Sequence, residues 1–196
     1  MTEALAILAA GATLVCLGAL VYLHTLPTGY RPLTDAVSDY GVGPHRVWYR
    51  VQASALGIAG ILLAGALWSG VDPVPVRPIG LLFVFGLARL AIPSYPTDLD
   101  RTKPTPTGRI HIRLAAVAFV TIAFAAPTLH GAVRHDPSWA GVVQLLGWLG
   151  WAVASTALAT GIALRVPALQ HRFGLIERLL YAAMIAWFLV VSIHLA

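Results

Sequence analysis

Hydrophobic residues fall into six long runs along this chain, and short polar stretches separate them. A helix needs about 20 mostly apolar residues to cross the hydrocarbon core of a bilayer. The third run, residues 79–92, reaches that length only with its flanking residues. The pattern therefore predicts six transmembrane helices, at about residues 4–23, 51–68, 76–94, 112–129, 142–164 and 175–195.

Small residues recur at close spacing inside two of these segments. Gly57 and Gly60 share one segment, and Gly147 and Gly150 share another. Such spacings let helix backbones approach each other in lipid. We therefore expect an all-α fold: a polytopic membrane protein with a six-transmembrane-helix bundle, in which residues 1–196 form a single integral membrane domain.

Composition supports a membrane location. Only 11% of the residues are charged and the mean hydropathy is +0.78, whereas about a quarter of the residues in soluble globular proteins are charged. A formal net charge of +5 would suggest nucleic acid as the partner of a soluble protein. In a membrane protein, Lys and Arg at one face set the topology and contact anionic headgroups. We therefore expect membrane lipids as partners, and no nucleic acid.

Basic residues are distributed unequally between the two sides of such a bundle. Six spans place both termini on one side, which holds only Arg77 and Arg134. Because cytoplasmic loops carry excess Lys and Arg, we predict a multi-pass protein of the cell inner (plasma) membrane with both termini extracytoplasmic. The ten basic residues of the first, third and fifth loops and their helix ends, which would be cytoplasmic, are Arg31, Arg46, Arg50, Arg101, Lys103, Arg109, Arg113, Arg165, Arg172 and Arg178.

The first loop contains an unusually polar stretch, TDAVSDYGVGPHR, at residues 34–46. Its pattern predicts a short helix that Thr34 caps and that Gly41 ends in a left-handed conformation. Asp39 would then lie at the carbonyl end, where a negative charge is disfavoured. It should therefore have a cationic, metal or hydrogen-bonding partner, and the nearest candidates by sequence are His45, Arg46 and Arg50.

The third loop is the second polar element on the same side. Its four prolines stiffen the chain, and Asp98 precedes a basic run that ends at His111 and Arg113. If the two loops meet, five side chains would gather that suit Zn²⁺ or another divalent metal, whose bound water can attack an ester or amide. These metal candidates are His24, Asp39, His45, Asp98 and His111.

Other interpretations of these polar residues remain open. Ser38 beside Asp39 offers a nucleophile in principle, although no HExxH or GxSxG motif accompanies either chemistry. A purely structural alternative is that the polar groups cap helices and link the two loops through salt bridges.

Two charged residues inside predicted spans are informative because burying a charge in a membrane is costly. Arg89 lies near the end of the third span, and Glu177 lies in the first turn of the last. We expect them to pair with each other. The alternative is that Arg89 anchors an anionic headgroup.

Several stretches together resemble the prokaryotic membrane family known as domain of unknown function 998. They are PTGYRPLTDAVSDYGVG, WYR, PTD, TPTGRIHIRLA and IERLLYAAMIAWFLVVSIHLA, and they span nearly the whole chain. The resemblance implies a six-helix membrane bundle with no assigned activity. The family's recurring polar positions would correspond here to Ser38, Asp39, Tyr40, Gly41, Pro96, Thr97, Asp98, Gly108, His111 and Glu177.

These observations favour a binding function at the basic face: a lipid headgroup or another anionic ligand, or an accessory role beside other membrane subunits, without a cofactor. The alternative is a membrane-embedded metal-dependent hydrolase acting on a lipid ester or amide, with zinc or another divalent metal, so the sequence leaves open whether the protein is an enzyme. The candidate ligand-binding residues are Ser38, Asp39, Tyr40, Arg89, Asp98, Arg109, His111, Arg113 and Glu177.

Overall fold

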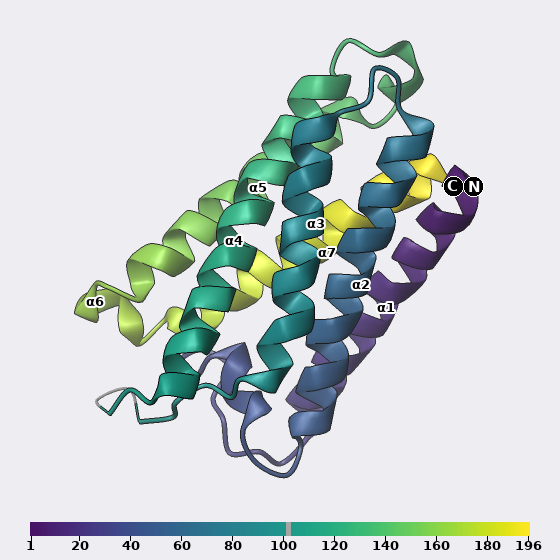
Figure 1. Cartoon of the computed structure of the whole chain (residues 1–196). Coiled ribbons are helices and arrows are strands. Elements are labelled where there is room, and N and C mark those ends of the chain that lie inside the picture. The colour runs from purple at the N-terminus through teal and green to yellow at the C-terminus, as the bar shows by residue number, and fades with distance from the viewer. Residues whose placement is uncertain (101–102) are drawn as a thin grey trace.

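Six long apolar helices run side by side in the computed structural model, which describes residues 1–100 and 103–196 (Figure 1). Arg101, one of the ten basic residues above, lies outside the described residues. The long helices are α1 (Thr2–Thr25), α2 (Arg46–Gly70), α3 (Val76–Ala91), α4 (Pro106–Val133), α5 (Val143–Ala163) and α7 (Phe173–Leu195). The shorter elements are α6 (Pro167–Gln170) and the 3-10 helices η1 (Val37–Gly41), η2 (Ile92–Ser94) and η3 (Pro137–Trp139).

All six long helices are apolar and long enough to cross a membrane, with α3 and η2 together forming the third, Val76–Ser94. The predicted all-α bundle with six spans is therefore confirmed. Individual boundaries differ by a few residues, most of all at the start of α4, where a polar side chain caps the helix beyond its apolar run. At the start of α4, the Thr105 hydroxyl accepts a hydrogen bond from the Gly108 N–H at 3.0 Å, and Pro106 occupies the first turn. The helix consequently begins six residues before the predicted span.

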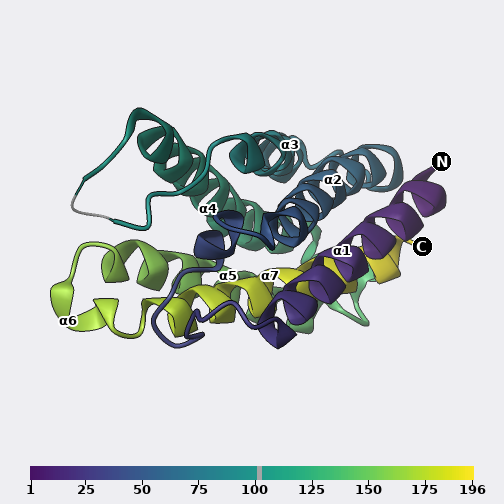
Figure 2. The ribbon, with the colours of Figure 1, turned by 90° about the horizontal axis from the view of Figure 1, so that it is seen from below.

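Each long helix packs against its neighbours in sequence, and α7 closes the bundle by packing on both α5 and α1. Figure 2 views this arrangement from below, and η1 packs against α2 and α7. Small residues permit the closest approaches, as expected. A Cβ on Gly57 would lie 2.9 Å from the Gly86 carbonyl oxygen of α3, and one on Gly150 would lie 3.2 Å from the Ala126 carbonyl oxygen of α4.

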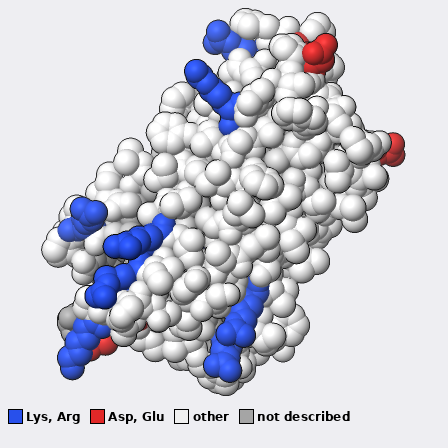
Figure 3. Space-filling view, viewed as in Figure 1, with Lys and Arg blue, Asp and Glu red and all other residues white. Residues whose placement is uncertain are grey.

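The bundle has two ends of different character. Both termini lie at one end, together with the loops at 71–75 and 134–142 (Figure 1). The described segments 26–45, 95–100, 103–105 and 164–172 form the other, which we call the basic end. Figure 3 shows Lys and Arg side chains concentrated toward it. The polar residues of the first and third loops thus share one end of the molecule.

Candidate functional site

The polar segment of the first loop folds around two aspartates. Asp35 accepts hydrogen bonds from the Arg31 N–H at 2.7 Å and from the Thr34 hydroxyl at 2.8 Å. Asp39 reaches back to the Ala36 N–H at 2.9 Å, at the start of η1. Burial raises the pKa of Asp35, but these hydrogen bonds and the nearby positive charges outweigh burial and hold the pKa below its usual value. Both carboxylates therefore stabilise the loop itself.

This local structure corrects two details of the sequence analysis. The helix is a 3-10 helix that starts after Ala36, so Thr34 does not cap it. Gly41 does not adopt the left-handed conformation, which occurs instead at Gly29 and Gly43, with φ of 76° and 102°. Asp39 bonds the backbone at the start of η1, because a 3-10 helix this short brings its side chain back to the preceding N–H.

The loop is held against the start of α7 by several hydrogen bonds. The buried carboxylate of Glu177 accepts the Val37 N–H at 2.7 Å. Arg178 donates from Nη1 to the Asp35 carbonyl at 2.8 Å, and the Leu175 N–H donates to the Leu33 carbonyl at 3.1 Å. Residues from opposite ends of the sequence thereby fix the position of η1.

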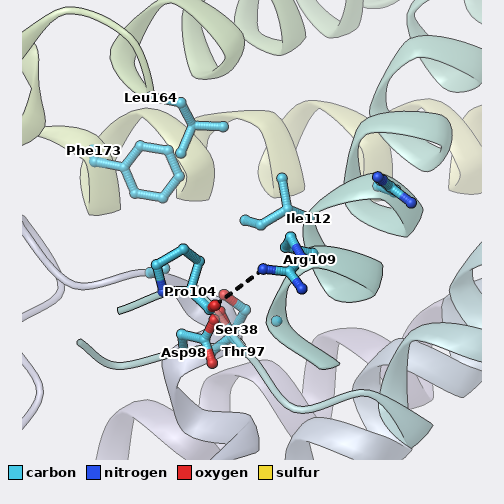
Figure 4. Close-up of a pocket in the computed structure, with 11 residues that line it drawn as sticks. Ser38, Thr97, Asp98, Pro104, Arg109, Ile112, Leu164 and Phe173 are labelled. Atoms are coloured by element: carbon cyan, nitrogen blue, oxygen red, sulfur yellow. Dashed lines mark hydrogen bonds between the residues drawn. The ribbon is translucent and has the colours of Figure 1, made fainter. Parts of the chain in front are cut away.

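A pocket of about 380 Å³ opens beside η1, between the start of α4, the C-terminal end of α5 and the start of α7 (Figure 4). In the figure, Ser38, Thr97, Asp98 and Pro104 lie across from Leu164 and Phe173, with Arg109 and Ile112 of α4 beside them. One wall is thus polar and the other apolar. The eleven lining residues are Ala36, Ser38, Thr97, Asp98, Pro104, Gly108, Arg109, Ile112, Arg113, Leu164 and Phe173.

Asp98 builds the polar wall of this pocket. Its carboxylate accepts hydrogen bonds from the Thr105 N–H at 2.9 Å and from the Thr105 hydroxyl at 2.7 Å. The same hydroxyl caps α4 through Gly108, whose missing side chain makes room for the Asp98 carboxylate. Asp98 therefore shapes the third loop and the start of α4, and both lie at the pocket.

Two arginines, one helical turn apart on α4, supply the positive charge. Both are exposed. Arg109 donates one hydrogen bond, of 3.3 Å, to the Pro104 carbonyl. Arg113 makes no hydrogen bond or ion pair to any residue of the described chain, and neither does the half-buried hydroxyl of Ser38. The pocket thus combines an uncommitted guanidinium and an uncommitted hydroxyl.

Arg89 lies elsewhere, in the interior of the bundle, and is 2% exposed. It donates from Nη1 to the Tyr181 hydroxyl at 2.9 Å and from Nη2 to Gln52 Oε1 at 3.3 Å, while its Nε has no partner in the described structure. No direct Arg89–Glu177 salt bridge forms among the described residues; Glu177 instead accepts the Val37 N–H. The expected pair is therefore not found, and Arg89 is not exposed to lipid.

Tyr40 is a structural residue with little exposed surface, at 2%. Its ring packs edge-on to Tyr30 at 5.2 Å and lies 5.5 Å from the His24 ring, with the Arg178 guanidinium 5.9 Å away. With His45 it borders a second, smaller pocket of about 120 Å³. This pocket is lined mainly by loop residues and does not include the arginines of α4.

The proposed metal ligands do not come together. His24 uses both ring nitrogens, Nδ1 toward the Leu20 carbonyl and Nε2 toward Arg178, each at 2.7 Å. His111 directs Nδ1 toward the Tyr95 carbonyl at 2.7 Å. Among residues 1–100 and 103–196, no three His, Cys, Asp or Glu side chains are grouped as metal ligands would be.

Sequence reasoning missed Gln52, Arg178 and Tyr181 as members of these networks. An amide inside an otherwise apolar run was the available signal for Gln52. For Arg178 and Tyr181 the signal was weaker, because an arginine near a helix end and a tyrosine near an interface are ordinary features of membrane helices.

Residues 7–194 match a protein-family model described as "Protein of unknown function (DUF998)". Comparison with curated proteins gives no match, and neither does comparison with solved structures.

Proposed function

The chain belongs to the DUF998 family of proteins of unknown function, and we propose that this integral membrane protein binds the headgroup of an anionic lipid in the pocket at its basic end. The proposal assigns the phosphate to Arg113, Arg109 and Ser38. It assigns the adjoining apolar part of the lipid to Ile112, Leu164 and Phe173.

The position of Arg113 is the observation that carries this proposal. The residue lies seven positions beyond Pro106, the first residue of α4, which is about 10 Å along the helix axis at 1.5 Å per residue. It is exposed on a helix that is long and apolar enough to span a membrane. A charge at this depth is costly unless it has a partner or reaches the interface. Since no described residue pairs with Arg113, a lipid phosphate at the membrane surface is a fitting partner.

The pocket wall also suits an amphipathic ligand. Guanidinium groups form strong, charge-assisted hydrogen bonds with phosphate, and the Ser38 hydroxyl can donate one more. Leu164 and Phe173 face these groups across the pocket (Figure 4) and offer an apolar surface to the glycerol backbone or the start of an acyl chain. A free phosphate ion has no apolar part to contact that surface.

Further charges around the pocket favour the same class of ligand. Lys103, Arg165 and Arg172 are exposed at the basic end. Basic residues at a membrane surface attract anionic lipids by about 1 kcal/mol each. We further propose that the basic end is cytoplasmic and that both termini are extracytoplasmic in the inner (plasma) membrane, because cytoplasmic loops are enriched in Lys and Arg.

Metal-dependent hydrolysis has less support, since His24, Asp98 and His111 are engaged in separate local networks. For an accessory role beside another membrane subunit, no contact surface stands out among residues 1–100 and 103–196. Lipid binding is the function that the geometry of this end favours.

The test compares lipid binding by the wild type and Arg113→Gln, using native mass spectrometry of detergent-purified protein. We expect phosphatidylglycerol to be retained in preference to phosphatidylcholine, and Arg113→Gln to lower its affinity about tenfold, as the loss of one charge-assisted contact implies. Arg77→Gln, an exposed arginine at the opposite end, is the matched control and should bind like the wild type.

Two soluble probes separate a lipid from a free anion. Inorganic phosphate and glycerol 3-phosphate should compete poorly with phosphatidylglycerol if the apolar wall contributes. Effective competition by either would instead assign the site to a soluble phosphate compound. Equal binding of phosphatidylglycerol by the wild type and Arg113→Gln would overturn the proposed site.

A further inference from the structure

The backbone from Asp35 to Ser38 has the pocket on one side and α7 on the other. Ala36 and Ser38 line the pocket. Val37, between them, donates its N–H to the buried Glu177 carboxylate at 2.7 Å. The location of the Ser38 hydroxyl therefore depends on a hydrogen bond made by its neighbour behind the pocket wall.

Arg178 secures the same backbone one residue earlier. Its Nη1 donates to the Asp35 carbonyl at 2.8 Å and to the Gly174 carbonyl at 2.9 Å, and its Nε donates to His24 at 2.7 Å. One side chain thus joins α1, the first loop and α7. Neither Glu177 nor Arg178 lines the pocket.

The other end of η1 is held separately by α2. A Cβ on Gly41 would lie 2.8 Å from the Tyr49 ring, which is buried at 3% exposure. With that end packed against an aromatic ring, the contacts to α7 control the end of η1 that carries Ser38.

We infer that Glu177 and Arg178 are positioning residues of the headgroup site, and that they act on the ligand through the location of Ser38. This inference rests on the proposed function. A hydrogen bond from a hydroxyl weakens steeply when donor and acceptor move beyond about 3 Å or lose alignment. Release of Val37 would therefore remove the Ser38 contribution and leave the attraction of Arg113 in place.

The experiment is a double-mutant cycle between Glu177 and Ser38, read as affinity for phosphatidylglycerol. Glu177→Met keeps the approximate volume but removes the acceptor for Val37. We expect Glu177→Met and Ser38→Ala each to lower affinity about fivefold, the size of one hydrogen bond. The double variant should also lose about fivefold, because the second substitution removes an interaction already lost.

Glu177→Gln is the conservative variant of the cycle. Its amide oxygen can still accept the Val37 N–H, so its affinity should stay within about twofold of the wild type. If Glu177→Met does not fold, Arg178→Lys replaces it, since a lysine keeps the charge but cannot form the same forked contacts. In a cycle with Ser38→Ala, the double variant should again lose no more affinity for phosphatidylglycerol than either single variant.

A loss of about 25-fold in the double variant, the product of two independent fivefold effects, would refute action through Ser38. An equally low affinity for phosphatidylglycerol in Glu177→Gln and Glu177→Met would also refute action through Ser38. Failure of the proposed function has a different signature: the wild type would show no preference for phosphatidylglycerol and no dependence on Arg113. The two failures can therefore be told apart.

Discussion

The carboxylate of Asp98 occupies the space where a side chain on Gly108 would begin. Both residues belong to the turn that starts α4, where Asp98 bonds Thr105 and Thr105 bonds Gly108. The absence of a Cβ at this glycine therefore allows the third loop to close onto the helix beside the pocket.

Gly108→Ala should destabilise the protein by about 1 to 3 kcal/mol, because the new methyl group displaces Asp98 and breaks its two hydrogen bonds to Thr105. Thermal unfolding in detergent measures the effect. Gly131→Ala is the matched control on the same helix, since nothing lies near a Cβ at that position. The control should be neutral or slightly stabilising, and an equal loss in both variants would contradict the steric explanation.

Arg89→Lys should lower the free energy of unfolding by about 1 to 3 kcal/mol. A lysine keeps the positive charge but has no guanidinium to reach both Tyr181 and Gln52, so at least one buried polar group loses its partner. Unfolding in detergent, followed by intrinsic fluorescence, measures the difference. Arg77→Lys, exposed on the same helix, should change stability very little. Wild-type stability of Arg89→Lys would show that the network contributes nothing.

Asp35 should make stability depend on pH in the acid range. Its pKa is below the usual value in the folded protein, so its ionised form stabilises the fold above about pH 4, and this contribution disappears as the pH falls through the folded pKa. Asp35→Asn should therefore unfold at a lower temperature than the wild type at pH 6, and the difference should shrink toward pH 3. Glu3→Gln is the control, because the exposed Glu3 carboxylate accepts no hydrogen bond from the described residues. Its difference in unfolding temperature from the wild type should change less with pH. If the difference in unfolding temperature between Asp35→Asn and the wild type did not change with pH, the ionised Asp35 carboxylate would not stabilise the fold.

The proposed orientation can be tested with introduced cysteines. The native thiol, Cys16, is fully buried, so a membrane-impermeant maleimide should react weakly with the wild type in intact cells. Ala140→Cys, at the end shared by the termini, should be labelled from outside, whereas Thr107→Cys at the basic end should be labelled only after the cells are opened. The reverse pattern would place the basic end outside.

The sequence predicted those features that depend on local composition. Hydropathy located the six spans because each helix must be apolar over its own length. Capping moved the start of α4, where the Thr105 side chain, outside the apolar run, satisfies the first turn of the helix. The small residues on α2 also packed as expected, with Gly57 against Gly86.

Pairings across the bundle were harder to predict. Their charges and their positions near the same end predict a pair between Arg89 and Glu177, but Glu177 bonds the backbone of Val37, 140 positions away in sequence. A backbone N–H has no sequence signature, so such a partner cannot be identified from residue types. The metal hypothesis relied on residue types in the same way. The side chains of His24, Asp39 and His111 instead bond nearby backbone groups.

The closure of the bundle by α7 has a consequence for biogenesis. This last helix supplies Tyr181 to Arg89, Glu177 to Val37 and Arg178 to His24. While the ribosome is still synthesising α7, the guanidinium on α3 lacks its hydroxyl partner and the first loop lacks both anchors. The polar interior and the pocket wall can therefore assemble only after α7 enters the bilayer.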